Sequence, residues 1–142
     1  MPPNAPELPE WPPGTVAVLS TGADDPHAIP VSAFVRAGPR AVLLALAAGR
    51  ESLRRLREDS RCALTLLAAG DVALTAHAHA RVVSEDLAGT GVVAVLLDVD
   101  TIQEHGQPTF EILEGVRWRW TDGDAERRDT RVHEALRELA DA

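Results

Sequence analysis

Residues 41–67 read AVLLALAAGRESLRRLREDSRCALTLL, and this stretch decides the fold. A short apolar run covers residues 41–48, a charged segment covers residues 50–59, and a second apolar run begins at residue 62. The apolar runs are short and bounded by turn or charged residues, which favours strands over helices. Within the charged segment, Leu53 and Leu56 are three residues apart and therefore share one helix face. The stretch predicts a strand, a helix of about two to three turns and another strand.

Other short apolar runs, separated by turn residues, predict further strands. They are residues 16–19, 28–35, 71–83, 92–99 and 111–120. Pro30 interrupts one of them and, because a proline cannot donate to a ladder, indicates a sheet edge or a bulge. Residues 84–88 predict a single helical turn, and residues 124–142 predict a terminal helix with Asp124 as its N-cap.

Strands outnumber helices in this pattern, and few strands are separated by helices. That order favours an antiparallel barrel over a doubly wound parallel sheet. Residues 15–142 are long enough for one domain. Residues 1–14 hold six of the ten prolines, which predicts an extended, solvated arm that Trp11 pins to the body or to a partner chain.

Composition limits the functions that this chain can perform. Of 142 residues, 45% are hydrophobic and 25% are charged, and the formal net charge is -8. An acidic chain is a poor general nucleic-acid binder, because that binding rests on many phosphate contacts. The single Cys62 excludes an internal disulfide framework and fits a reducing compartment. No secretory signal and no membrane-spanning apolar run is readable, so we expect a cytoplasmic protein.

An arginine cluster is the most conspicuous charged feature of this acidic chain. It consists of Arg50, Arg54, Arg55, Arg57 and Arg61. One interpretation is a solvated helix face balanced by neighbouring acidic residues. The other is an anion site, because guanidinium groups bind phosphate and a helix start adds N–H donors. In that case Arg50 and Arg54 share a helix face and are ligands together with the Ser52 hydroxyl, while Arg55 and Arg57 turn away.

Two further pairs of residues are candidates for function. Trp118 and Trp120 are two residues apart, so on a strand they share one face and form either a packing surface, a dimer contact or an aromatic wall for a planar ligand. His77 and His79 also share a face but lack a third ligand in the sequence, so we expect no metal site. Cys62 has no nearby base and fits a small core residue better than a nucleophile.

The sequence resembles the flavin-binding split barrel of the pyridoxamine 5'-phosphate oxidase-like superfamily. The matching segments lie within residues 15–83 and read VAVLSTG, PHAIPVSAFV, the stretch quoted above and VALTAHAHARVV. The most specific part is ESLRRLREDSRCAL, which is similar to the short basic helix that ends in Asp-Pro-Arg before a strand in this family. Here Ser60 replaces the proline.

The resemblance implies a mainly β (α+β) fold. Its core is a six-stranded antiparallel split β-barrel with a short helix after the third strand and a C-terminal helix. It also implies a homodimer with FMN in a cleft between the subunits. The ring would lie along Ile29, Pro30, Val31, Ser32 and Ala33. The phosphate would be held at the helix start by Arg50, Ser52 and Arg54, and Thr75 would add a polar contact.

Two departures from the family change what the resemblance implies about activity. Ser52 stands where the family often has a lysine, and the C-terminal Arg-Leu-His-Asp-Arg substrate signature is missing. We therefore do not expect the pyridoxamine 5'-phosphate oxidase reaction itself. The prediction is an FMN-binding flavoprotein, an oxidoreductase acting on a small molecule. A deazaflavin-dependent reductase and a non-catalytic flavin-binding or interaction protein are the alternatives.

Overall fold

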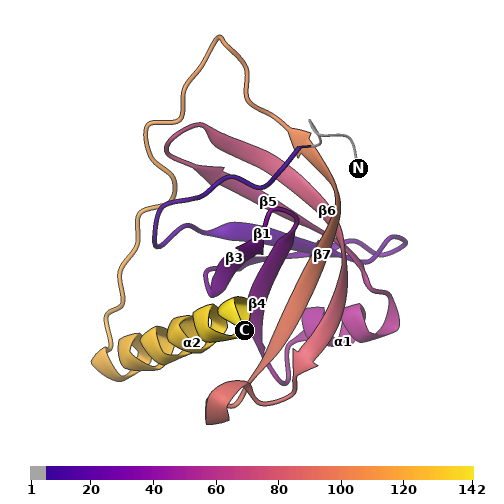
Figure 1. Cartoon of the computed structure of the whole chain (residues 1–142), viewed down its shortest axis with the longest axis vertical. Helices are drawn as coiled ribbons and strands as arrows, with labels where there is room; N and C mark the ends of the chain where they lie inside the picture. The colour runs from indigo at the N-terminus through magenta and orange to yellow at the C-terminus, as the bar shows by residue number, and fades with distance from the viewer. Residues whose placement is uncertain (1–5) are drawn as a thin grey trace.

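The computed structural model describes residues 6–142, and residues 1–5 of the arm lie outside the described part. One antiparallel sheet dominates it (Figure 1). Its strands are β1 (Ala17–Thr21), β2 (His27–Val31), β3 (Phe34–Gly38), β4 (Ala41–Ala47), β5 (Arg61–Ala68), β6 (Val72–Ser84) and β7 (Val92–Glu104). The strand order is β2-β1-β5-β6-β7-β4-β3, so the described sheet has seven strands and not the six expected.

The two edges of this sheet follow each other directly in the chain. β2 and β3 are separated only by Ser32 and Ala33, yet they stand at opposite ends of the strand order. The sheet must therefore curl until its edges meet at this joint, which makes a barrel that is split between β2 and β3. The single strand expected over residues 28–35 is thus two strands, while the mainly antiparallel β class is confirmed.

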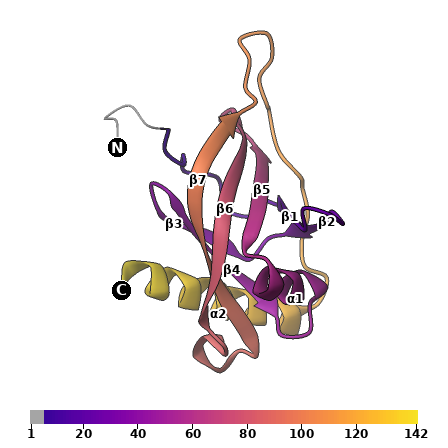
Figure 2. The ribbon, with the colours of Figure 1, turned by 90° about the vertical axis from the view of Figure 1, so that its right-hand side faces the viewer.

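Two helices and a short 3-10 turn, η1 (Leu87–Gly89), complete the fold. Helix α1 (Glu51–Glu58) contacts β1, β2 and β6, and lies beside the β1–β2 hairpin (Figure 2). Helix α2 (Gly123–Asp141) contacts β3, β4 and η1. Within the described chain, neither helix combines the length and the apolar character that crossing a lipid bilayer requires.

The interior consists of two apolar clusters. The larger one fills the barrel with inward-facing strand residues, among them Leu19, Leu44 and Leu64, and takes in Leu53 and Leu56 of α1. The smaller one lies under α2. There Val132, Ala135 and Leu136 meet Val35, Leu43 and Ala94. Residues 92–97 alternate between these clusters, so strand β7 is covered on both faces within one chain.

Residues 6–14 of the arm run along the barrel, where most of them are exposed, while Leu8 and Trp11 pack against the core, so Trp11 pins the arm to the body. Leu8 is only 2% exposed and belongs to the main core. Its N–H donates to the carbonyl of Pro39, and its own carbonyl accepts from Arg36 Nε. The ring of Trp11 lies against the ring of Phe34, and the two ring centroids are 5.4 Å apart. The prolines keep this segment extended, and side-chain and backbone contacts hold it on the body.

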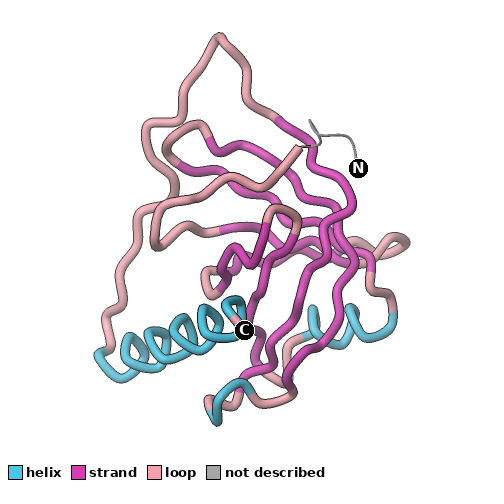
Figure 3. The backbone as a smooth tube through the Cα atoms, viewed as in Figure 1, coloured by secondary structure: helices cyan, strands magenta, loops and turns pink. Residues whose placement is uncertain are grey.

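The strand predicted over residues 111–120 is wrong. This segment belongs to a long connection without helix or strand between β7 and α2 (Figure 3). A Cβ at Gly115 would lie 2.8 Å from the Leu67 carbonyl oxygen, so the chain crosses that strand end closely instead of pairing with it. The segment is held by scattered hydrogen bonds, for example from Ile112 N–H to the Asp71 carboxylate. The helix cap also differs, since Asp122 and not Asp124 accepts the N-terminal hydrogen bond.

Replacing Leu8 tests whether the arm is part of the fold. Leu8→Ala removes a buried side chain from the main core and should lower the free energy of unfolding by about 2–4 kcal/mol. Urea denaturation followed by tryptophan fluorescence measures this change. Leu113→Ala is the matched control, because Leu113 is 79% exposed and its loss should be nearly neutral. Equal stabilities of the two variants would show that the arm contributes nothing to the core.

Candidate functional site

The start of helix α1 carries a buried hydroxyl group. Arg50 is the N-cap residue and makes no side-chain capping hydrogen bond. Ser52, at the second helical position, is 1% exposed, and its Oγ has no hydrogen-bond partner in the described part of the chain. The Thr21 hydroxyl at the end of β1, which α1 contacts, is also buried and unpartnered there. Buried polar groups without partners are uncommon and costly, so this corner is a candidate for ligand contact.

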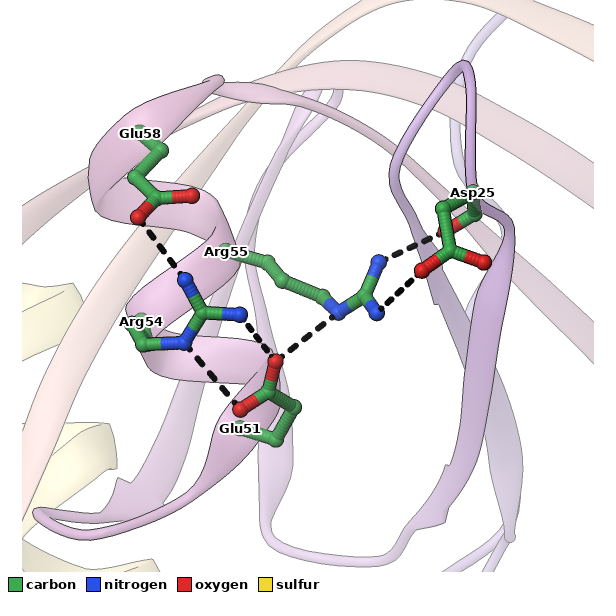
Figure 4. A network of polar contacts seen from close by, with 5 residues as sticks. All are labelled: Asp25, Glu51, Arg54, Arg55 and Glu58. Carbon is green, nitrogen blue, oxygen red and sulfur yellow. Dashed lines mark hydrogen bonds and ion pairs between the residues drawn. The ribbon is translucent and has the colours of Figure 1, made fainter.

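Four of the five arginines of the cluster contact carboxylates, and Figure 4 shows two of them, Arg54 and Arg55. Arg54 lies between Glu51 and Glu58 of its own helix turns, with a 2.8 Å contact to Glu58. Its hydrogen bond to Glu51 holds the pKa of that carboxyl below its ordinary value. Arg55 bridges to Asp25 at 3.0 Å and thereby ties α1 to the β1–β2 turn. Arg54, predicted as a phosphate ligand, is thus already neutralised within the helix.

The remaining members of the cluster divide in the same way. Arg57 makes a two-pronged contact with Glu85, at 3.1 and 2.7 Å, and this hydrogen bonding lowers the pKa of Glu85. Arg61 forms an ion pair with Asp59 at 2.9 Å, and its hydrogen bonds lower the pKa of Asp59 to about 2. Arg50 is exposed and has no ion pair or side-chain hydrogen bond within residues 6–142. Arg50 is therefore the arginine of this cluster whose guanidinium group can bind an external anion.

The predicted ring-binding segment lies at the split of the barrel. β2 pairs only with β1, so Pro30 stands in an edge strand, where a missing N–H is tolerated. Ile29 packs against the main core and Val31 is buried in it, so their side chains point inward. The side chain of Pro30 is exposed on the opposite face. The backbone of this strand and the exposed side chains of Ala28 and Pro30 therefore remain available to a ligand.

Pro30 and Thr75 lie on one row that crosses the outer face of the sheet. The register pairs Pro30 with Val18, Val18 with Thr65, Thr65 with Thr75, and Thr75 with Gln103. The Thr65 and Thr75 hydroxyls are 3.0 Å apart, and Thr75 is 2.8 Å from Nε2 of His105. Two residues predicted separately thus share a surface. Thr65 and His105 were missed, because local sequence does not show which distant residues lie beside Thr75.

Ser32 and Ala33 form the joint between the barrel edges, and both carbonyls are used. The Ala33 carbonyl accepts from the Ala45 N–H at 2.9 Å. The Ser32 carbonyl lies 3.2 Å from Nε2 of His133 in α2, and His133 Nδ1 lies 3.0 Å from the Asp129 carbonyl. His133 therefore attaches α2 to the joint. The sequence contains no signal for this role, since nothing in a helix pattern identifies a distant strand as partner.

The two tryptophans lie at this same joint. Trp118 Nε1 donates to the Gly14 carbonyl at 2.9 Å, and its ring meets Trp120 edge-to-face at 5.2 Å between centroids. Trp118 lines a cavity of about 480 Å³ between the arm, β3 and α2, and Ser32 contributes to its wall. Trp120 lines a second, smaller cavity together with Ser32 and Ala33. The structure thus groups Ser32, Ala33 and both tryptophans, apart from the arginines of α1.

The histidines on β6 do not form a metal centre with other residues in the described chain. His77 and His79 point outward, and His79 Nδ1 contacts the Asp100 carboxylate. No group of three or more potential ligands comes together within residues 6–142. Cys62 is buried in the core beneath them, and burial raises the pKa of its thiol to about 12. A thiol with that pKa stays protonated at neutral pH and is a poor nucleophile.

Comparison with known proteins extends this description of the fold. No protein-family model and no curated protein matches the chain. Solved structures do match. A pyridoxamine 5'-phosphate oxidase-like protein from Lactobacillus delbrueckii superposes with a TM-score of 0.58 at 20% identity, over 70% of this chain and 96% of that one. The chain has the split-barrel fold of these proteins.

Two other solved structures that match this chain are named as flavin proteins. A FAD-binding protein from Mesorhizobium loti superposes with a TM-score of 0.51 at 9% identity, over 62% of this chain and 83% of that one. The flavin reductase PheA2 superposes with a TM-score of 0.51 at 17% identity, over 66% of this chain and 81% of that one. These similarities establish the fold, and the resemblance inferred from the sequence agrees with them.

The Asp59–Arg61 pair gives a pH prediction. With its pKa lowered to about 2 in the folded protein, Asp59 should stay ionised down to that pH. The pair stabilises the fold above the ordinary carboxyl value, and this contribution is lost as the pH falls toward 2. Arg61→Gln should return the Asp59 pKa toward 3.8, which carboxyl ¹³C NMR measures. Arg57→Gln should leave it unchanged, and an Asp59 that titrates near 3.8 in the wild type contradicts the pairing.

Proposed function

We propose that this chain binds FMN at the split of its barrel and acts as a flavin-dependent oxidoreductase on a small molecule. One observation carries the proposal. A helix start with an unpaired arginine and one unpartnered buried hydroxyl lies beside β1 and the edge strand β2, and β1 ends in a second buried hydroxyl without a partner. These are Arg50, Ser52 and Thr21. A phosphate group needs such donors, and the ring of a flavin needs an adjacent surface with free backbone groups.

The residues at the helix start fit a phosphate group in their chemistry. Hydroxyls donate to phosphate oxygens, and a guanidinium adds a charge-assisted contact. A phosphate oxygen would remove the cost of a buried hydroxyl that has no partner. Glu51 and Glu58 oppose the anion, but Arg54 lies between them and neutralises part of their charge. In this arrangement Arg50 and Ser52 are direct ligands, and Arg54 acts by screening Glu51.

The ring would lie along β2 and the outer row of the sheet. Pro30, on the edge strand β2, lies at one end of that row, and Thr65 and Thr75 lie further along it. Side chains of this size allow a flat ring to approach the backbone. Bound FMN would supply the hydride or electron chemistry, while these residues orient it. The names of two structural neighbours, a FAD-binding protein and a flavin reductase, support a flavin as the cofactor.

The same face supports a homodimer. Val18 is 40% exposed and Leu67 is 55% exposed on this side of the sheet, although both are large apolar residues. A second copy would cover them and close the cofactor cleft. Trp11 and residues 92–97 are engaged within their own chain and are not available for this contact. We therefore assign the interface to the face that contains Val18 and Leu67.

Titration with FMN tests the cofactor site. Arg50→Ala should weaken FMN binding about 10- to 150-fold, because it removes a charge-assisted contact. Glu51→Gln should tighten binding, because it removes a like charge and releases Arg54. Arg57→Ala should have little effect, since Arg57 is paired with Glu85. Quenching of flavin fluorescence measures all three.

The outcome also separates the alternative functions. Equal small effects of Arg50→Ala and Arg57→Ala contradict the phosphate site and indicate a solvated helix face. If the protein binds a deazaflavin in place of FMN, the absorption band is shifted and the bound coenzyme fluoresces strongly. If it is an interaction protein that binds no flavin, neither coenzyme's spectrum changes when the protein is added. The absorption spectrum of the purified protein with each added coenzyme distinguishes these cases.

Sedimentation equilibrium tests the dimer. Leu67→Glu places a charge on the proposed interface and should convert a dimer to a monomer at micromolar concentration. Thr130→Glu adds the same charge on α2, away from that face, and should leave the dimer intact. A wild-type monomer, or a Leu67→Glu dimer, contradicts the assigned interface.

A further inference from the structure

A second cavity of about 320 Å³ lies where α2 passes the joint between β2 and β3. Its wall combines one aromatic ring, two cationic side chains, one carboxylate, two hydroxyls and small apolar residues. The residues that matter for its chemistry are Trp120, Arg128, Arg131, Ser32, Ala33 and Val132. None of them belongs to helix α1, so this cavity is separate from the proposed phosphate site. Its volume is at the small end of the range for ligand pockets, about 300–1,000 Å³, which suits one or two rings.

The aromatic wall is held in place from outside the cavity. Trp120 meets Trp118 edge-to-face, with an angle of 79° between the ring planes. Trp118 is in turn fixed by its hydrogen bond to the Gly14 carbonyl. Trp120 is nevertheless 37% exposed, so part of its ring remains free for a ligand. A flat aromatic molecule stacks favourably on such a surface.

The cationic side chains of the cavity are unpaired. Arg128 and Arg131 are three residues apart on α2 and therefore share one helix face. Neither has an ion pair or a side-chain hydrogen bond in the described residues, whereas the adjacent Arg127 is paired with Asp124. The one carboxylate at the cavity, that of Asp129, lies 3.4 Å from His133 Nδ1. In a chain of net charge -8, this local excess of positive charge marks a place for an anion.

We propose that this cavity binds a small planar aromatic carboxylate. Its ring would stack on Trp120 above Ala33 and Val132, and its carboxylate would face Arg128 and Arg131. The Ser32 hydroxyl makes no hydrogen bond within residues 6–142 and would donate to the same carboxylate. The small apolar floor favours a singly charged carboxylate over a phosphate dianion, because a dianion costs more to remove from water. Planar guanidinium groups also match carboxylate geometry.

The experiment uses 2-naphthoate as the probe on flavin-free protein, so its result is independent of the proposed flavin site. Two ligands of the same shape are compared with it: the neutral 2-naphthamide and the cationic 2-naphthylmethylammonium. Isothermal titration calorimetry measures the three dissociation constants. We expect naphthoate to bind about ten-fold more tightly than the amide and the ammonium compound to bind most weakly.

The variants test the assigned residues. Arg128→Gln and Arg131→Gln should each weaken naphthoate binding about five-fold and leave amide binding unchanged. Arg127→Gln is the matched control on the same helix and should have no effect. Equal binding of naphthoate and naphthamide, no naphthoate binding at millimolar concentration, or an equal loss in Arg127→Gln each overturns the proposal. The comparison of the three ligands on wild-type protein tests the preference for a carboxylate even where a variant folds poorly.

Discussion

The two-residue joint between β2 and β3 is the constraint on which the rest of the structure depends. These strands are the outer edges of a seven-stranded sheet, and a flat sheet of this size would separate its edges by about 29 Å. Three Cα steps lead from Val31 to Phe34, and they span at most about 11 Å. The sheet can satisfy both conditions only by curling through most of a turn. Curling encloses the inward-facing apolar side chains of all seven strands in the main core, and leaves a split at Ser32 and Ala33.

The joint also determines where other elements attach. Its backbone cannot continue a ladder, so its carbonyls must find partners elsewhere. Ala45 supplies one donor from β4, and His133 lies within hydrogen-bond distance of the other from α2. Helix α2 is therefore held at the split by a polar contact as well as by its apolar face. Because α2 is held there, the connection that precedes it brings Trp118 and Trp120 to the same place.

Much of this fold is predictable from local sequence, because short apolar runs and turn residues act within a few positions. The helix over residues 50–59 and the edge position of Pro30 are examples. Contacts that depend on distant partners are not predictable in this way. Residues 111–120 alternate like a strand, yet they pair with none and cross the end of β5 closely at Gly115. The i,i+4 spacing predicts the pairs Arg54–Glu58 and Glu51–Arg55, and both are present. It does not predict the second partner of Arg55, which comes from the β1–β2 turn, or the pairing of Arg57 with Glu85.

Charge pairing explains why an acidic chain without lysine can still have sites for anions. Acidic residues outnumber basic ones here, and half of the fourteen guanidinium groups lie beside a carboxylate, as Arg54 and Arg57 do. Such pairs are exposed and add little stability, but they remove positive charge from the surface. The surface potential then stays positive only near arginines that have no carboxylate partner. Arg50 lies at a helix start, and Arg128 and Arg131 lie at a cavity. Anion affinity therefore depends on which arginines remain unpaired, more than on how many the chain contains.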